Sequence, residues 1–142
     1  MFTLHPRLNQ DTFQIADLPL SRLCMMNDER FPWFILVPRV NDITEIHQLA
    51  ENDRMQLMRE SCVLAETLMS IFSGYKMNVA ALGNMVPQLH IHHVVRFQED
   101  VAWPGPIWCT GTPVAMDDPT VSQRQKQILD ALCQILPDTI RL

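Results

Sequence analysis

Polar and apolar side chains alternate over residues 88–96, the most regular pattern in the chain. Side chains two residues apart on a β-strand point to the same face of the sheet. A strand here would carry Gln88, His90 and His92 on one face, and apolar residues on the other, where only His93 breaks the pattern. Because the apolar face predicts contact with a buried core, we expect the polar row to lie where it can meet a ligand.

Four further segments have the composition of β-strands, and they are residues 12–15, 21–26, 33–37 and 76–82. The run at 33–37 is apolar throughout and stops at Pro38, which predicts a strand buried on both faces. The first twelve residues form a polar lead-in that we expect to be turn or extended chain. A connection with room for a helical turn is expected over residues 40–46.

The hydrophobic period changes to that of a helix between residues 52 and 72. Arg59, Glu60 and Glu66 should face away from the core. The buried stripe is predicted to contain Leu57, Cys62, Ala65, Leu68, Met69 and Phe72. A second amphipathic helix is predicted over residues 121–136. Neighbouring strands with one long helix between the third and fourth predict class α+β, with an antiparallel sheet of about five strands.

Composition limits the classes of function. With 142 residues, 47% hydrophobic and 19% charged, the chain is expected to form a single domain over residues 1–142. The net charge of −5 argues against non-specific binding to nucleic acid. The four cysteines are scattered, which predicts neither a zinc site nor a disulfide framework. No signal peptide is recognisable and no apolar run reaches the ~20 residues of a membrane helix, so we expect a cytoplasmic protein that does not bind membranes.

The histidines of residues 88–96 allow three kinds of chemistry. A neutral imidazole can attack phosphorus or a carbonyl carbon and form a covalent intermediate. His90 and His92, two residues apart on one face, can also chelate a metal ion, although no Cys or Glu pattern nearby supplies a third ligand. Buried histidines can equally be hydrogen-bonded structural residues. The residues by themselves leave all three open.

Residues 86–96 (V-P-Q-L-H-I-H-H-V-V-R) resemble the signature strand of the histidine triad (HIT) family, in which histidines alternate with apolar residues. Residues 34–39 resemble the apolar strand of the family that ends in Pro and a basic residue. The similarity covers about residues 12–100, before a C-terminal loop and helix in 101–142. The chain is similar to a group of bacterial HIT-like hydrolases that carry Gln in place of the first histidine. These hydrolases also carry a W-P-G-P loop, which is residues 103–106 here. The resemblance implies a HIT-like fold.

The resemblance also implies roles for individual residues. His90 matches the nucleophile, which attacks the α-phosphorus of a nucleotide and gives a nucleotidyl-histidine that water hydrolyses. His92 matches the third histidine, which contacts phosphate or a neighbouring backbone group. The residues implied to bind substrate are Gln88, Asn27 (ribose), Asn78, Asn84 (phosphate) and Met25 (base or ribose). Family members use no catalytic metal or other cofactor, take a small nucleotide as partner, and are commonly homodimers.

Three departures from the family pattern bear on activity. Gln88 replaces the first histidine, and an amide forms hydrogen bonds but transfers no proton. Trp33 replaces a further histidine near the phosphates, and the turn before it is shorter than usual. We therefore expect a nucleotide hydrolase or nucleotidyl transferase whose leaving group needs little protonation, as in a dinucleoside polyphosphate. The alternative is a nucleotide-binding protein with weak or no turnover.

For four residues outside the triad, structural roles are weighed against functional ones. We expect His93 to be a half-buried histidine with its hydrogen bonds satisfied. Arg96 is expected either to bind phosphate or to be a solvated or salt-bridged arginine. Trp103 and Trp108 are expected at the mouth of the pocket, at a dimer contact, or simply packed in the protein.

Overall fold

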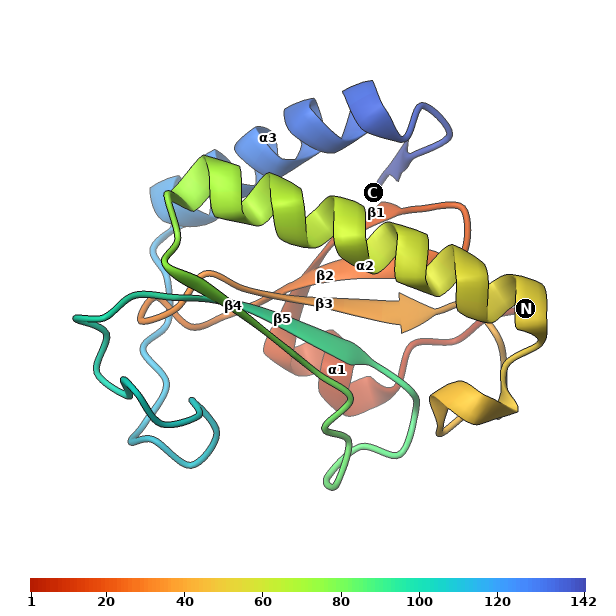
Figure 1. The fold of residues 1–142 in the computed structure, drawn as a ribbon, viewed down its shortest axis with the longest axis horizontal. Coiled ribbons are helices and arrows are strands. Elements are labelled where there is room, and N and C mark those ends of the chain that lie inside the picture. Colours follow the sequence, from red (N-terminus) through yellow and green to blue (C-terminus); the bar gives the residue numbers. More distant parts are fainter.

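Six strands form a single antiparallel sheet in the order β4-β5-β3-β2-β1-β6 (Figure 1). The computed structural model describes residues 1–142. The strands are β1 Thr12–Asp17, β2 Ser21–Met26, β3 Trp33–Pro38, β4 Lys76–Ala80, β5 Ile91–Arg96 and β6 Ile140–Arg141. The predicted α+β class with an antiparallel sheet is confirmed. The sequence did not predict β6, because its two residues are too few and too exposed to show a period.

The helices lie on both faces of this sheet. They are α1 Pro6–Asp11, α2 Glu51–Phe72 and α3 Asp118–Ile135, with a single 3₁₀ turn, η1 Ile46–Gln48, before α2. Figure 1 shows α2 and α3 together on one face, while the short α1 lies on the other. None of the helices combines the length and the apolar composition needed to cross a membrane.

Helix α1 contradicts the expectation of turn or extended chain for the first twelve residues. Pro6 stands in its first turn, where a missing backbone N–H does no harm, and the imidazole Nδ1 of His5 accepts a hydrogen bond from the Arg7 backbone N–H at 3.1 Å. Arg7 and Asp11 form an ion pair one turn apart, and Leu8 is buried against the sheet. A helix with one buried residue shows no hydrophobic period, so the pattern of residues 6–11 did not predict it.

The main core lies between the sheet and the two long helices, and its α2 stripe differs in part from the predicted one. Leu57 and Leu68 are buried as expected, but Cys62 is exposed and Glu60 is 0% exposed. The Glu60 carboxylate accepts hydrogen bonds from the backbone N–H groups of Leu20 at 2.7 Å and Ser21 at 3.1 Å. A buried carboxylate is tolerated when its oxygens are hydrogen-bonded in this way. The prediction that Glu60 faces solvent was therefore wrong.

His93 joins the sheet to α2 on the helix-covered face. Its ring is 0% exposed, its Nδ1 donates to the Ile91 carbonyl at 3.1 Å, and its Nε2 accepts from the Ser61 hydroxyl at 2.7 Å. Burial lowers the pKa of His93 to about 4, so the ring is neutral at pH 7. The prediction of a hydrogen-bonded structural histidine is confirmed, although the side chain is fully buried and not half-buried.

Candidate functional site

A pocket of about 450 Å³ opens on the sheet face opposite α2 and α3, which is a suitable size for a small molecule. It is lined by Arg7, Leu8, Asp11, Met26, Trp33, Leu82, Asn84, Met85, Val86, His90, His92, Trp108 and Cys109. The lining is mostly apolar, and its charged members, Arg7 and Asp11, are paired with each other at 2.9 Å. His90 and His92 are therefore the only imidazoles of the pocket, whose other lining residues are mostly apolar and whose two charged side chains offset each other.

His90 stands immediately before β5, which begins at Ile91 and not at residue 88 as predicted. Its Nδ1 lies 2.7 Å from the backbone carbonyl oxygen of Gln88. Because a carbonyl only accepts hydrogen bonds, Nδ1 carries the proton and Nε2 carries the lone pair. Burial lowers the pKa of His90 below its ordinary value, which keeps the ring neutral at pH 7. His90 thus presents an unprotonated Nε2 that makes no hydrogen bond within the protein.

His92 lies beside His90, with ring centroids 4.9 Å apart, but both of its nitrogens are occupied. The indole N–H of Trp33, which can only donate, lies 2.9 Å from His92 Nδ1. His92 Nε2 therefore carries the proton and donates to the Leu82 carbonyl oxygen at 2.9 Å. Burial lowers the pKa of His92 to about 4. The two neighbouring histidines are thus held in opposite tautomers.

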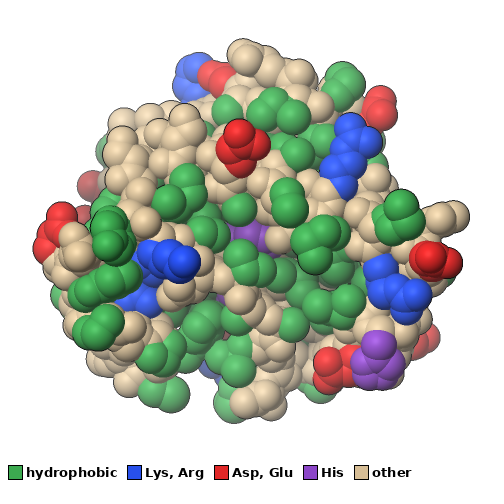
Figure 2. All heavy atoms as spheres, viewed as in Figure 1, with side chains coloured by type: hydrophobic (Ala, Val, Ile, Leu, Met, Phe, Trp, Pro, Cys, Tyr) green, Lys and Arg blue, Asp and Glu red, His purple; other side chains and the backbone are tan.

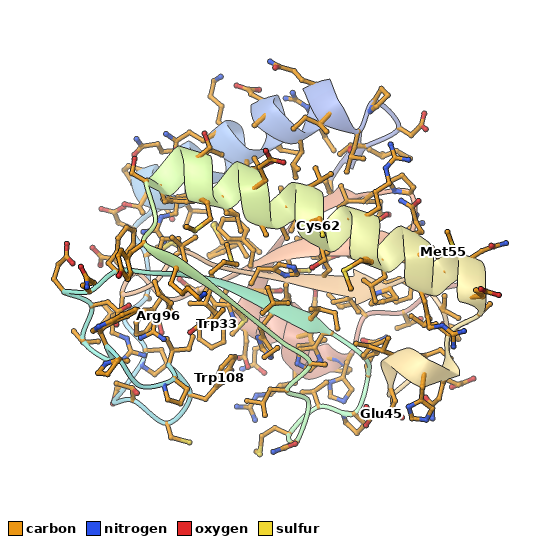
Figure 3. The ribbon with its side chains drawn as sticks, in the orientation of Figure 1. Trp33, Glu45, Met55, Cys62, Arg96 and Trp108 are labelled. Atoms are coloured by element: carbon orange, nitrogen blue, oxygen red, sulfur yellow. The ribbon has the colours of Figure 1, made fainter.

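Two tryptophans form an aromatic wall next to these histidines. Trp33 and Trp108 meet edge to face with centroids 6.3 Å apart, and the Trp108 ring lies 5.2 Å from that of His92. Figure 3 shows both tryptophans on the side of the sheet away from α2. Trp103 lies elsewhere, against Tyr75 and the guanidinium of Arg96. Of the two loop tryptophans, only Trp108 lines the pocket.

Gln88 was expected beside His90 as a substrate ligand, and the structure places it elsewhere. Its amide oxygen accepts from the His5 backbone N–H at 2.8 Å, and its amide nitrogen donates to the Thr3 carbonyl at 2.9 Å. The strand alternation that would have put Gln88 next to His90 does not apply, because β5 begins only at Ile91. Gln88 uses its donor and its acceptor to hold the N-terminal segment.

Asn84 is the one predicted amide that lines the pocket, where it is exposed. The side chain of Asn78 accepts from the Arg96 guanidinium at 2.8 Å and does not line the pocket. Arg96 is 1% exposed and paired with Asp100 at 2.8 Å, which is the structural alternative that the sequence left open. Asn27 accepts from the Met116 backbone N–H at 2.9 Å and therefore fastens the C-terminal loop.

Met25 was expected to contact the base or ribose, and this placement is wrong. Its side chain is 0% exposed within the main core, on the face covered by α2 and α3. The next residue, Met26, points to the opposite face and lines the pocket. Since neighbouring strand residues face opposite sides, an error of one residue exchanges core and pocket. The pocket residues of α1, Arg7, Leu8 and Asp11, were missed because the helix itself was not predicted.

The chain contains no group of three or more His, Cys, Asp or Glu side chains placed to hold a metal ion. The pair His90 and His92 offers one unoccupied ring nitrogen, that of His90. The chemistry that this arrangement supports is attack by, or hydrogen bonding to, a single neutral imidazole.

The antiparallel sheet, the long helix between β3 and β4, and paired histidines at the start of β5 define the class of histidine triad folds. The family model described as HIT domain matches residues 7–99. The chain belongs to the HIT domain family. No curated protein matches it.

Solved structures resemble the chain over nearly its whole length. A histidine triad protein from Marinobacter aquaeolei VT8 has 47% identity and a TM-score of 0.92, covering 94% of this chain and 98% of that one. One from Bradyrhizobium japonicum has 42% identity and a TM-score of 0.90, covering 92% and 97%. A hypothetical histidine triad nucleotide-binding protein from Sulfolobus tokodaii strain7 shares the fold at 12% identity, with a TM-score of 0.64 and coverage of 92% and 93%. The predicted HIT fold is confirmed.

Proposed function

We propose that this protein is a HIT-type nucleotide hydrolase or nucleotidyl transferase that acts on the α-phosphate of a nucleotide derivative, such as a dinucleoside polyphosphate. Members of the HIT family are generally nucleotide hydrolases or transferases. The observation that carries the proposal is the tautomer of His90, whose Nδ1 is bonded to the Gln88 carbonyl at 2.7 Å while Nε2 is available in the pocket. A neutral imidazole with one fixed proton is the form that a nucleophilic histidine needs.

In the proposed reaction, the lone pair of His90 Nε2 forms a bond to the α-phosphorus, and the bond from phosphorus to the leaving oxygen breaks. The leaving group departs with the bonding electrons. The positive ring of the nucleotidyl-histidine is stabilised by the Nδ1–H···O bond to Gln88. Water, or another acceptor hydroxyl, then attacks phosphorus, loses its proton, and releases neutral His90. The phosphorus–nitrogen bond breaks in this second step.

The leaving group departs without a proton from the neighbouring side chains. We infer that Gln88 stands in the place of the first triad histidine, and both ends of its amide are occupied by the N-terminal segment. His92 has no unoccupied nitrogen, since it is bonded to Trp33 and Leu82. This supports a leaving group that is stable as an anion, such as a phosphate or polyphosphate. In this proposal Asn84, which lines the pocket, donates to phosphate oxygens, and the lining residues Met26 and Trp33 supply apolar surface for the nucleoside.

The test is turnover of a panel of dinucleoside polyphosphates and nucleotide esters, combined with intact mass after rapid quenching. The wild type should release a nucleoside monophosphate and show a transient nucleotidyl adduct, and His90→Ala should lose both. His47→Ala, on the exposed turn η1, is the matched control and should keep both. Equal turnover by wild type and His90→Ala on every substrate would overturn the proposal.

A second candidate is a protein that binds nucleotides with weak or no turnover. It is supported by the same occupied side chains, because neither Gln88 nor His92 is available to move a proton. Calorimetry with nucleoside monophosphates separates the two functions. Binding without His90-dependent turnover supports this candidate, and measurable His90-dependent turnover rejects it.

We further propose that the protein is a homodimer that joins through β4 and α2. Strand β4 is an edge of the sheet, so one side of its backbone has no neighbouring strand. Tyr75 and Val79 at this edge and Met55 and Met58 on α2 are exposed. Figure 2 shows hydrophobic side chains across the middle of this face and charged ones mostly around its rim. Light scattering should give the mass of two chains for the wild type and of one for Val79→Lys; a monomeric wild type contradicts the proposal.

We also propose that residues 1–142 act as a single HIT-like domain, which is supported by one core cluster that extends from Ile15 to Leu136. The protein works in the reducing cytoplasm, which is supported by its four free cysteines, of which Cys62 and Cys109 are exposed. Fractionation of cells that express a tagged chain tests the second proposal.

A further inference from the structure

Trp33 stands where the family pattern has a histidine, so the resemblance assigns no role to its indole. Its indole N–H donates to His92 Nδ1 at 2.9 Å, which leaves His92 only one way to use its second nitrogen. With Nδ1 accepting, the proton of the neutral ring stays on Nε2, and Nε2–H donates to the Leu82 carbonyl at 2.9 Å. Without the indole, the Leu82 carbonyl would be the only group that favours the proton on Nε2, and a shift of the proton to Nδ1 would cost this one bond instead of two.

The Leu82 carbonyl belongs to the connection between β4 and β5, which has no helix or strand of its own from residue 81 to residue 90. This connection forms one wall of the pocket through Leu82, Asn84, Met85 and Val86. Because the segment has no regular structure, its position depends on the few hydrogen bonds that join it to the rest of the protein. The hydrogen bond from His92 is one of them, and the backbone bond from Leu89 N–H to the Ile43 carbonyl at 2.9 Å is another.

The same connection lies against the proposed nucleophile. A Cβ atom on Gly83 would come within 3.4 Å of His90 Cε1 and 2.8 Å of the Val86 carbonyl oxygen, so a side chain at this position would press on the edge of the His90 ring and on the backbone of the connection. Leu82, which His92 holds, is the residue immediately before Gly83. A shift of Leu82 therefore changes both the packing around His90 and the place of Asn84 in the pocket.

We propose that Trp33 is a positioning residue: its indole N–H fixes the tautomer of His92, His92 fixes Leu82, and the segment 82–86 thereby holds Asn84 and the His90 ring in their reactive arrangement. The catalytic part of this proposal rests on the proposed function, whereas the tautomer and the position of the segment are properties of the free protein. Misplacement of reacting groups by about 1 Å lowers rates by up to about 100-fold, so a small shift of this segment has a large expected effect.

The chain offers a matched pair of variants. Trp33→Phe removes the indole N–H and keeps an aromatic ring in the wall. Trp108→Phe removes the other indole N–H of the same aromatic cluster, which is buried and makes no hydrogen bond. His93, on the opposite face and bonded to Ser61, reports on folding in both variants.

Long-range ¹H–¹⁵N NMR spectra of the three histidines give the tautomers directly. The wild type and Trp108→Phe should show His92 with its proton on Nε2 and His90 with its proton on Nδ1. In Trp33→Phe, the His92 signals should move toward a mixture of tautomers while those of His93 stay in place. Backbone hydrogen exchange in segment 82–86 should become faster in Trp33→Phe only. An unchanged His92 tautomer in Trp33→Phe, or unchanged exchange in this segment, would overturn the proposal.

Kinetics test the catalytic part. With any substrate that His90 turns over, Trp33→Phe should lower kcat by about 10- to 100-fold and change KM by less than that. An unchanged kcat would overturn it, even where the NMR result is as expected. If no substrate is turned over by the wild type, the proposed function fails, and the NMR and exchange measurements still decide whether Trp33 positions His92 and the segment.

Discussion

The hydroxyl of Ser61 lies 2.7 Å from Nε2 of His93, and this bond joins α2 to β5. Its counterpart on the other face is the bond between Trp33 and His92, at 2.9 Å. His92 and His93, which are adjacent in β5, thus point to opposite faces of the sheet. Both ring nitrogens of each residue are hydrogen-bonded, and one of these bonds joins β5 to another element, which is β3 for His92 and α2 for His93. Of the three histidines between 90 and 93, only His90 keeps an unoccupied nitrogen.

Removing the Ser61 hydroxyl should destabilise the protein. Ser61→Ala leaves the buried Nε2 of His93 without a hydrogen-bond donor, and an unsatisfied buried group costs about 1–3 kcal/mol. Urea denaturation at pH 7.5 measures the free energy of unfolding. Ser70→Ala, at an exposed position of the same helix, is the control and should change it by less than about 0.5 kcal/mol. Equal stability of the two variants would contradict the importance of this bond.

Stability should decrease as the pH falls from about 6.5 toward 4. Burial lowers the pKa values of His92 and His93 to about 4, whereas in the unfolded chain a histidine titrates at about 6.5. Below pH 6.5 the unfolded chain therefore binds more protons, and stability that is fully present above this pH is progressively lost. This difference of about 2.5 in pKa corresponds to about 3 kcal/mol for each histidine.

Denaturation at pH 7.5, 6.0 and 5.0 measures this loss. Asp28 and Asp100 should add little to the change between pH 7.5 and 5.0. Burial raises the pKa of each carboxyl, but the hydrogen bonds from Arg30 and Arg96 outweigh it and lower the pKa, so the stability from these pairs is lost mainly as the pH approaches the value of about 3.9 of an unfolded aspartate. His90, whose pKa is also lowered by burial, contributes in the same direction. His93→Gln removes one of these three histidines and should give a shallower slope, whatever its stability at pH 7.5. A free energy of unfolding that is constant across this range would show that these rings accept protons in the folded state.

Gln88→Ala should loosen the N-terminal segment. The change removes the acceptor for the His5 N–H and the donor to the Thr3 carbonyl, which are the two side-chain bonds that tie the start of the chain to the triad region. Hydrogen exchange of residues 5–11 should become faster, and α1 should be cleaved more readily by protease. Gln98→Ala, an exposed residue just after β5, is the control and should leave both unchanged. Protection of α1 at the wild-type level in Gln88→Ala would show that Leu8 and its apolar neighbours suffice.

Glu60→Gln should destabilise the β1–β2 turn although it changes a single atom. The amide keeps one oxygen, but its NH₂ group must face a backbone N–H of Leu20 or Ser21, both of which are donors. Hydrogen bonds to a charged acceptor contribute about 1.5–3 kcal/mol, and we expect a loss of about 2 kcal/mol. Glu66→Gln, exposed on the same helix, should be neutral by urea denaturation. A neutral Glu60→Gln would mean that the turn is held by packing alone.

The parts of the fold that repeat a hydrophobic period were predictable, and the exceptions share one physical cause. Strands β1 to β5 follow from alternation, from strand-like composition or from a continuous apolar run, and both long helices follow from a helical stripe. The buried carboxylate of Glu60 and the amide of Gln88 are stabilised by backbone groups distant in sequence, with separations of 39 to 85 residues. A hydrophobic period carries no information about such partners.

The sequence predicted the two histidines of the site, but it predicted few of the other residues that line the pocket. His90 and His92 lie together in the pocket as the pattern suggested. The choice between Met25 and Met26 depends on which face of β2 is covered by helices, and this is fixed by pairing with β3, not by the strand itself. The predicted roles of Gln88, Asn27 and Asn78 came from a family whose polar side chains face a ligand, whereas here each of them bonds another part of the chain.

The bonds from Gln88 to Thr3 and His5 also determine when the pocket can form during synthesis. Gln88 follows His5 by 83 residues and Thr3 by 85, so these bonds cannot form until that much more of the chain has been made after the Thr3–His5 segment. At about 5–20 residues per second, this wait lasts several seconds. The pocket wall formed by α1 is thus translated before the rest of the pocket. It is fixed in place only after Gln88, and with it the nearby His90 and His92, has left the ribosome.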